Sequence, residues 1–205
     1  VDLAITDRAY QQEAIQRVSQ VFEDGKRKAL ITMATGTGKT RTAMSLVDIF
    51  FKTNQAQRVL FIADRVALVK QALEEGFKAF LPDEPATRIH THKIDKTQRL
   101  YVVTLQTINN CFREFTPAFF DLIIFDEVHR SIFHKWNDVL QYFDARMIGL
   151  TATPADFIDR NTFLEFDCPD GIPTFLYSYD EAIEDGYLVD YDLYVAQTYL
   201  LKNLG

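Results

Sequence analysis

Five short apolar runs recur along the chain, and longer amphipathic stretches separate them. The runs are residues 28–33, 58–63, 100–104, 122–125 and 146–150. Continuous apolar runs of this length are typical of strands that are covered on both faces, as in parallel sheets. We therefore predict five buried strands.

Three of the intervening stretches have apolar residues at helical spacing. Residues 8–23 carry a stripe made of Ala14, Ile15, Val18, Val21 and Phe22. Residues 39–51 follow the first strand, and residues 66–80 follow the second. Alternation of strands and helices predicts an α/β fold, with a mostly parallel sheet sandwiched by helices. Right-handed crossovers then place the C-terminal ends of the strands on one edge, where ligands bind.

The pattern changes after Pro154. Residues 162–166 and 174–177 have the character of strands on either side of the turn-forming segment 169–171, which predicts a β-hairpin. Residues 180–185 predict a short helix that Gly186 ends, and residues 191–198 predict another strand.

Composition indicates an ordinary globular chain. Of 205 residues, 47% are hydrophobic and 25% are charged, which allows a sizeable core. The net charge of −7 argues against a uniformly basic nucleic-acid coat, although a local basic track remains compatible with it. Cys111 and Cys168 lie far apart, as expected for reduced thiols in a cytoplasmic protein.

The ends of the chain and its apolar runs bear on its location. No run approaches the length of a membrane span, so we expect no membrane partner. The first residues lack the basic region of a signal peptide, and the chain does not begin with Met. We expect a piece of a longer cytoplasmic protein.

A glycine-rich loop follows the first strand and opens the next helix. Its glycines, Gly36 and Gly38, allow backbone N–H groups to turn around phosphate oxygens. Lys39 would neutralise the terminal phosphates, and the Thr40 hydroxyl would bind Mg²⁺. The general pattern of such loops begins with glycine where this chain has Met33. The residues of this loop that we expect to bind the nucleotide are Thr35, Gly36, Thr37, Gly38, Lys39, Thr40 and Arg41.

Two adjacent carboxylates follow the fourth strand. Asp126 would reach the sheet edge beside the phosphate loop and bind Mg²⁺, directly or through water. Glu127 would polarise the attacking water as a general base. His129 could relay the nucleotide state through a hydrogen bond, or play a structural role. After the fifth strand, the hydroxyls of Thr151 and Thr153 could hydrogen-bond the acidic loop and sense the γ-phosphate.

Taken in order, these segments resemble superfamily 2 helicases and translocases. The matching motifs are GTGKT at 36–40, DEVH at 126–129 and TAT at 151–153, preceded by RAYQ at 8–11. By that resemblance, Gln11 would read the adenine edge of ATP, and Arg8 or Tyr10 would pack near the base. A glutamine amide can pair with adenine through two hydrogen bonds, so the chemistry is compatible.

Further segments resemble the motor subunit of type I restriction enzymes. They are MATGTGKTRTA at 33–43, ADRVALVKQA at 63–72, DEVHRS at 126–131, GLTATP at 149–154 and YSYDEAIEDGYLVDY at 177–191. In that family two RecA-like lobes flank the ATP and a nuclease domain precedes them. The resemblance implies that residues 1–155 form the first lobe and that residues 156–205 continue it toward a linker. It also implies methylation and specificity subunits as partners.

The same resemblance implies contacts with duplex DNA. They would involve Asp64, Arg65, Thr104, Gln106 and Thr107, where short hydroxyls and backbone N–H groups hold phosphates without reading sequence. Threonine and glutamine at such junctions also serve as helix caps.

Two functional hypotheses therefore compete. The first is ATP-driven movement along duplex DNA, or, within the same class, another superfamily 2 DNA or RNA helicase. The second is a nucleotide-binding module that switches a partner interaction without translocation. The intact Glu127 favours the first hypothesis, because a pure switch does not need a general base.

Overall fold

The computed structural model describes residues 2–91, 94–127 and 133–190, with only the backbone at 133–136. Seven strands form one sheet in the order β3-β4-β2-β5-β6-β1-β7, and every neighbouring pair is parallel. The strands are β1 Lys28–Met33, β2 Val59–Ala63, β3 Ala86–Arg88, β4 Leu100–Thr104, β5 Leu122–Asp126, β6 Arg146–Thr151 and β7 Phe175–Tyr177. The α/β class with a parallel sheet is confirmed.

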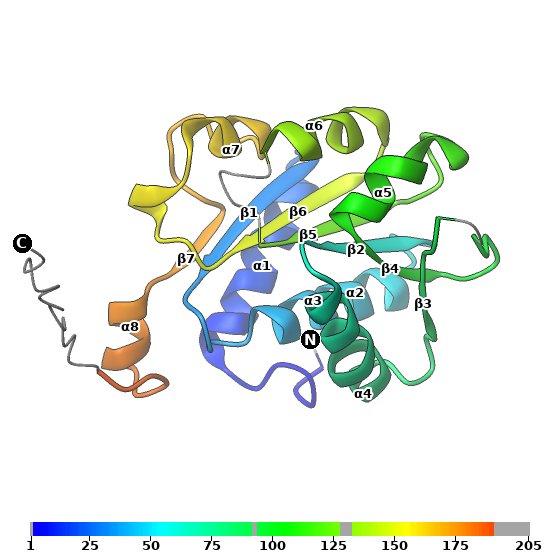
Figure 1. Cartoon of the computed structure of the whole chain (residues 1–205). Helices are drawn as coiled ribbons and strands as arrows, with labels where there is room; N and C mark the ends of the chain where they lie inside the picture. Colours follow the sequence, from blue (N-terminus) through cyan, green and yellow to red (C-terminus); the bar gives the residue numbers. More distant parts are fainter. Residues whose placement is uncertain (1, 92–93, 128–132, 191–205) are drawn as a thin grey trace, which may run out of the picture.

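Helices cover both faces of the sheet (Figure 1). On one face lie α1 Ala9–Glu23, α2 Lys39–Lys52 and a continuous segment made of α3 Val66–Gln71, a π-helical turn Ala72–Phe77 and α4 Lys78–Phe80. On the other face lie α5 Leu105–Cys111, α6 Phe133–Tyr142 and α7 Arg160–Glu165. The last described helix, α8 Tyr179–Glu184, lies beyond the β7 edge.

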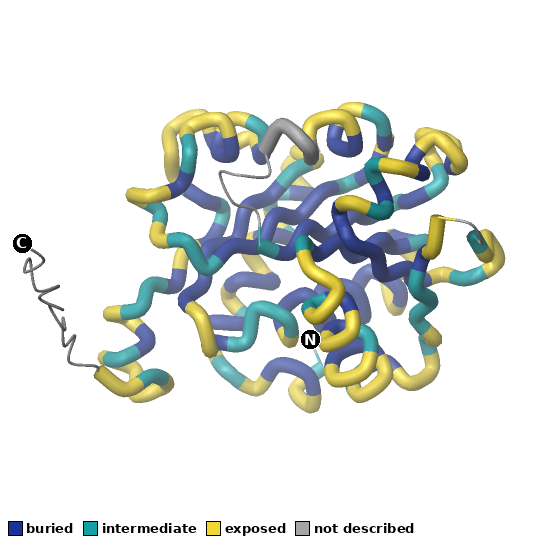
Figure 2. The backbone as a smooth tube through the Cα atoms, in the orientation of Figure 1, coloured by how far each residue is buried: buried dark blue, intermediate teal, exposed yellow. Residues whose placement is uncertain are grey.

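Each strand contributes to two cores because successive side chains point to opposite faces. In β2, Val59, Phe61 and Ala63 join the core under α1 and α2, whereas Leu60 and Ile62 join the core under α5 and α6. Figure 2 shows the resulting buried layer between two helical layers that are exposed on their outer sides. This double burial explains why the strands are continuous apolar runs in the sequence.

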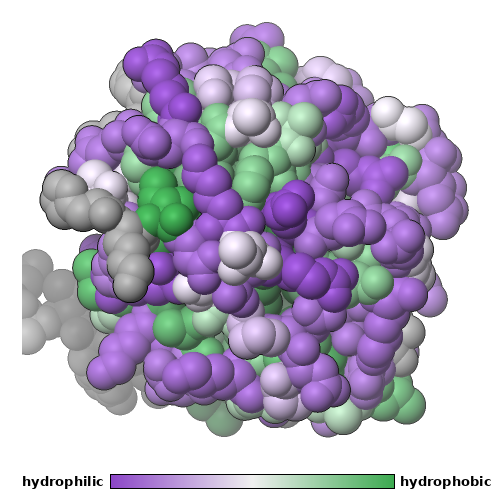
Figure 3. All heavy atoms as spheres, turned by 90° about the vertical axis from the view of Figure 1, so that its right-hand side faces the viewer, coloured by the Kyte–Doolittle hydropathy of each residue, from purple (hydrophilic) through white to green (hydrophobic). Residues whose placement is uncertain are grey.

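The outermost strand on one side, β3, has only partly buried residues. The face of the molecule at this edge is predominantly hydrophilic (Figure 3). Polar cover limits the pairing of an open strand edge with other chains.

The strands and helices predicted before Pro154 match the structure closely, and three further elements lie among them. Strand 28–33 and strand 100–104 have the predicted bounds, and the other three differ by one residue at an end. The periodicity did not predict β3, α5 or α6. The stretch 66–80 is helical as expected, but its middle turn is π-helical.

The predicted β-hairpin is wrong. Residues 162–166 fall largely within α7, whose first N–H groups are capped by the Asp159 side chain, which accepts a hydrogen bond from the Asn161 N–H at 3.0 Å. Thr162, Phe163 and Phe166 are buried and Leu164 is 49% exposed, which is the spacing of one helix face and not the alternation of a strand. The second predicted strand does form, as β7, but it pairs in parallel with β1.

Other expectations concern the C-terminal segment and the cysteines. The predicted helix at 180–185 is present as α8, whereas the predicted strand 191–198 lies outside the described residues. Cys111 and Cys168 are free and buried, and burial raises the pKa of both thiols. In the described part of the chain, no helix is both long and apolar enough to cross a membrane.

Candidate functional site

Three loops meet at one edge of the sheet. Strand β6 lies between β1 and β5, and all three run in the same direction. The loop after β1, the acidic pair after β5 and the threonines after β6 therefore leave the sheet side by side. Ligands of open α/β sheets bind at this carboxyl edge.

The loop after β1, which the sequence predicts to bind phosphate, turns at two glycines. Gly36 and Gly38 have φ angles of +86° and +90°, a region that side chains disfavour, and Gly38 is the N-cap residue of α2. The Thr37 hydroxyl donates to the Ala34 carbonyl at 2.6 Å, which closes the turn. The loop thus precedes the positive end of a 14-residue helix dipole.

Lys39 bridges the loop and the acidic pair. Its Nζ atom lies 3.6 Å from Glu127 Oε1 and donates to the Met33 carbonyl at 3.4 Å. Met33 takes the place of the usual glycine, and its side chain is fully buried in the core, where its sulfur lies 3.8 Å from the Thr42 hydroxyl. Because Lys39 contacts the backbone carbonyl of Met33 and not its side chain, methionine in place of glycine leaves this contact intact.

The acidic pair occupies the end of β5 and the first residue after it. Burial, and then the negative charge of Glu127, raise the pKa of Asp126 to about 6, although the charge of Lys39 opposes both effects. Glu127 has a φ angle of +59°, uncommon for a residue with a side chain. A strained backbone conformation of this kind persists only where the surrounding structure holds it, and such residues are often found at functional sites.

Replacing Asp126 with Asn is expected to stabilise the metal-free protein near neutral pH. The folded carboxyl has a pKa of about 6 against an ordinary value of 3.8, so the folded state binds a proton more tightly. The parent protein therefore loses stability as pH rises from about 4 to 6, and the loss persists above pH 6. The Asn variant should gain roughly 1–3 kcal/mol over the parent above pH 6.5 and almost nothing below pH 4.

Urea unfolding with a chelator at several pH values would measure this difference. Asp170→Asn, at an exposed position, serves as the matched control and should show no such trend. An advantage of Asp126→Asn that is equal at pH 4 and pH 7.5 would show that the carboxyl is not destabilised by its surroundings.

The N-cap and first turn of α1 place three further predicted residues, Arg8, Tyr10 and Gln11, behind the loop after β1. Gln11 Nε2 donates to the Thr37 carbonyl at 3.1 Å, and the Tyr10 hydroxyl donates to the same carbonyl at 2.7 Å. An Arg8 nitrogen donates to the Tyr10 hydroxyl at 2.7 Å. Gln11 is 1% exposed, and its Oε1 atom has no hydrogen-bond partner in the described part of the protein. A buried acceptor without a donor is costly, so this oxygen is suited to a ligand donor.

The aromatic surroundings of Arg8 and Tyr10 were not predicted. Tyr10 stacks on Tyr177 with ring centroids 3.9 Å apart, and Tyr187 meets Tyr10 edge to face at 5.1 Å. The Arg8 guanidinium lies 4.9 Å from the centroid of the Tyr187 ring. The segment 177–191 was singled out by resemblance only, because no local pattern connects it to a loop more than 130 residues earlier.

The remaining phosphate-loop residues have other surroundings. Thr35 and Arg41 are exposed, and the Arg41 guanidinium lies 4.9 Å from the Phe80 ring centroid. The methyl group of Thr40 faces Gly76 of the π-helical turn, at 3.6 Å from the position that a Cβ would take on that glycine. The π-helical turn therefore packs against the first turn of α2.

The residues expected to contact DNA lie at the same sheet edge, after β2 and β4. These strands are neighbours, and Ala63 pairs with Thr104. Arg65 is 81% exposed in its side chain and lies 3.7 Å from the Asp64 carboxylate. Thr104 caps α5: its hydroxyl accepts from the Thr107 N–H at 3.2 Å.

The threonine hydroxyls after β4 are thus engaged within the protein. Those of Thr104 and Thr107 lie 2.8 Å apart, whereas Gln106 is exposed. The helix-cap role weighed in the sequence is present, and contact with DNA stays a prediction.

Two expectations concern residues beyond this cluster. Thr151 ends β6, is fully buried and accepts a hydrogen bond from the Thr153 N–H at 3.0 Å, so both lie between the phosphate-loop strand and the acidic strand. His129 lies outside the described residues, and its predicted relay role stays a prediction.

Comparison with protein families gives a match to the family described as type III restriction enzyme, res subunit, over residues 4–156. Among curated proteins, the EcoAI type I restriction enzyme endonuclease subunit of Escherichia coli is 36% identical over 194 residues. That match covers 90% of this chain but only 23% of the relative, so the chain spans about a quarter of the relative's length.

Solved structures give the same picture. A fragment from Vibrio vulnificus YJ016, described as an HsdR subunit of a type I restriction enzyme, is 34% identical with a TM-score of 0.65. The match covers 87% of this chain and 32% of that one. The ATP-dependent type ISP restriction-modification enzyme LlaBIII, solved bound to DNA, has a TM-score of 0.69 at 20% identity and shares the fold. The match covers 90% of this chain and 16% of LlaBIII.

Proposed function

Because this chain belongs to the restriction-enzyme family described as the res subunit, we propose that it is the ATP-binding lobe of a DNA-dependent ATPase that translocates on duplex DNA. The observation that carries the proposal is the 3.6 Å approach of Lys39, which follows β1, to Glu127, which follows β5, at the carboxyl edge of the sheet. The similarity to type I endonuclease subunits favours the motor subunit of a type I restriction enzyme as the whole protein.

The charges of the site fit a magnesium-bound triphosphate. Asp126 and Glu127 place two carboxylates beside Lys39, and the repulsion between the two carboxylates contributes to the raised pKa of Asp126. A divalent cation would relieve this repulsion, and Mg²⁺ prefers oxygen ligands of this kind. Asp126 and the Thr40 hydroxyl would hold the metal, which would neutralise charge on the phosphates during transfer.

The chain's own residues then divide the remaining work. Backbone N–H groups of residues 36–39 would surround the phosphates, and Lys39 would exchange its partner Glu127 for a phosphate oxygen. Glu127, released from the lysine, would accept a proton from the attacking water. The unpaired Oε1 of Gln11 is an acceptor for the exocyclic amine of adenine.

Catalysis in this proposal also needs charge from another domain. A second RecA-like lobe of the same longer chain would close over the nucleotide and supply an arginine. Residues after β2 and β4 would hold the phosphate backbone of duplex DNA, with Arg65 providing charge. A nuclease domain of the same chain, together with methylation and specificity subunits, would complete the restriction enzyme in the cytoplasm.

Replacing Lys39 with Ala tests the proposed phosphate site. We expect MgATP affinity to fall by about 100-fold, since a charge-assisted contact to phosphate in a partly buried site contributes on the order of 2–3 kcal/mol. Titration calorimetry would measure it, with Lys26→Ala, an exposed position before β1 at the opposite sheet edge, as the control. Equal affinities for the two variants would contradict the proposal.

The three alternatives, a duplex-DNA translocase, another superfamily 2 helicase and a nucleotide-switched module, differ in which nucleic acid stimulates ATP hydrolysis. Stimulation of ATP hydrolysis by duplex DNA in the longer protein supports the translocase, whereas stimulation by RNA alone indicates another superfamily 2 helicase. A nucleotide-switched module would show nucleotide-dependent partner binding with no stimulation by either. Methylation and specificity subunits encoded beside this protein would favour the restriction enzyme.

A further inference from the structure

The turn that follows α8 reaches back to the phosphate loop. The N–H groups of Tyr187 and Leu188 both donate to the Ala182 carbonyl, at 2.8 and 2.9 Å, and Gly186 has a φ angle of +76°. A glycine in the left-handed conformation is a common end of a helix. A Leu188 methyl group lies 3.4 Å from the position that a Cβ would take on Gly36.

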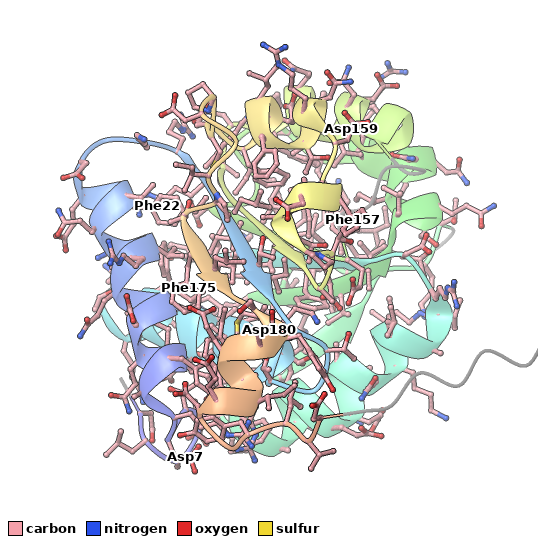
Figure 4. All side chains as sticks on the ribbon, turned by 90° about the vertical axis from the view of Figure 1, so that its left-hand side faces the viewer. Asp7, Phe22, Phe157, Asp159, Phe175 and Asp180 are labelled. Atoms are coloured by element: carbon pink, nitrogen blue, oxygen red, sulfur yellow. The ribbon has the colours of Figure 1, made fainter. Side chains whose placement is uncertain are left out.

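The base of this turn is anchored to α1. Tyr177, at the end of β7, stacks on Tyr10, and its hydroxyl donates to Asp185 at 2.8 Å. Strand β7 runs beside α1 and leads into α8 (Figure 4, with Phe175 marking β7 and Asp180 marking α8). The position of the turn relative to Arg8 is therefore fixed by packed elements from both ends of the chain.

Arg8 is held from two directions. Its nitrogen donates to the Tyr10 hydroxyl at 2.7 Å, and its guanidinium lies 4.9 Å from the Tyr187 ring centroid. A cation over an aromatic face is attracted by the ring quadrupole. The Tyr187 ring thus restricts a long side chain that would otherwise sample many rotamers.

We propose that Tyr187 is a positioning residue of the nucleotide site, which orients Arg8 beside Gln11 and thereby sets the contribution of the base to nucleotide affinity. This inference rests on the proposed function. Gln11 presents an unpaired, buried acceptor next to the loop, and adenine offers an amine donor where guanine offers a carbonyl. When Arg8 is held in place, the base is confined to the orientation in which Gln11 distinguishes the amine of adenine from the carbonyl of guanine.

The test compares binding of MgATP, MgGTP and magnesium tripolyphosphate, which lacks a base. Tyr187→Ala is expected to weaken MgATP binding roughly tenfold and to reduce the preference for MgATP over MgGTP by a similar factor. Binding of tripolyphosphate should stay within about twofold of the parent protein, because Lys39 and the loop are unchanged. Tyr187→Phe keeps the ring and should restore parent values.

A matched control lies two residues further along. Val189 is 84% exposed, so Val189→Ala shortens an apolar side chain of the same segment without altering the Arg8 contact. Arg8→Lys provides a second, independent variant, because it keeps the charge but removes the planar group that lies over Tyr187. It should reproduce the loss seen with Tyr187→Ala, and thermal unfolding would verify that each variant is folded.

Each other outcome overturns the inference. Equal or tighter MgATP binding by Tyr187→Ala would mean that the ring obstructs the site. Parallel loss of tripolyphosphate binding would mean that the turn only supports the phosphate loop, and a full loss in Tyr187→Phe would assign the effect to the hydroxyl. If the parent protein bound neither MgATP nor tripolyphosphate, the proposed function itself would fail, which is a different result.

Discussion

The 205-residue chain alone is expected to hydrolyse ATP about 10³–10⁵ times more slowly than a longer protein that carries a second RecA-like lobe after it. The chemical step develops negative charge on the transferred phosphoryl group. In the described residues, the cation that contacts the acidic pair is Lys39. An arginine from a second lobe would add positive charge at this point, and the rate range is that of arginine fingers in P-loop GTPases.

The measurement is single-turnover hydrolysis by both proteins at saturating MgATP, with and without duplex DNA. Saturation removes differences in affinity, so the ratio reports the chemical step. Glu127→Gln made in both proteins controls for contaminating ATPases. A chain that alone reaches the rate of the longer protein would contradict the assignment of half the catalytic site to another lobe.

Replacing Glu127 with Gln is expected to lower the turnover of the longer protein by about 10²–10⁴ while MgATP binding is retained. Glutamine keeps the shape of the side chain but cannot accept the proton of the attacking water. The substitution also removes the partner of Lys39 in the nucleotide-free site and one of two adjacent negative charges. We therefore expect the affinity for MgATP to stay equal or to rise by a few fold, on the order of 1 kcal/mol.

Glu23→Gln is the control for this substitution. Glu23 is exposed at the end of α1, shortly before β1 begins, and so lies at the opposite edge of the sheet. It should leave both turnover and binding unchanged. A loss of turnover in Glu127→Gln that is matched by a loss of binding would assign Glu127 to the nucleotide pocket rather than to proton transfer.

Much of the fold could be predicted because strands that are buried on both faces appear in the sequence as continuous apolar runs. Each of the five predicted strands is apolar on both faces, so its pattern survives without knowledge of its neighbours. Strand β3 escaped prediction because its three residues are only partly buried, which leaves no apolar run. Segment 162–166 was misassigned because so short a run does not separate helical from strand periodicity.

The candidate site also has a part that local sequence motifs predict and a part that depends on contacts between distant segments. Residues 36–40 and 126–127 can be predicted as a site because their chemistry is local: glycines at fixed offsets from a lysine, and carboxylates at a strand end. The aromatic contacts of Arg8 with Tyr187 were missed, since they join segments that lie near opposite ends of the chain. Spacing within either segment gives no indication of the other.

The sequence alone therefore determined the five buried strands and the positions of the glycine-rich loop and the acidic pair at strand ends, because hydrophobic period and local motif chemistry act over a few neighbouring residues. Only the tertiary structure decided that Lys39 pairs with Glu127, that Asp126 is buried enough to raise its pKa to about 6, and that the turn after α8 closes on Gly36. Those features depend on strand order and helix packing. Both are set by contacts between distant residues, and desolvation depends on everything that surrounds a group.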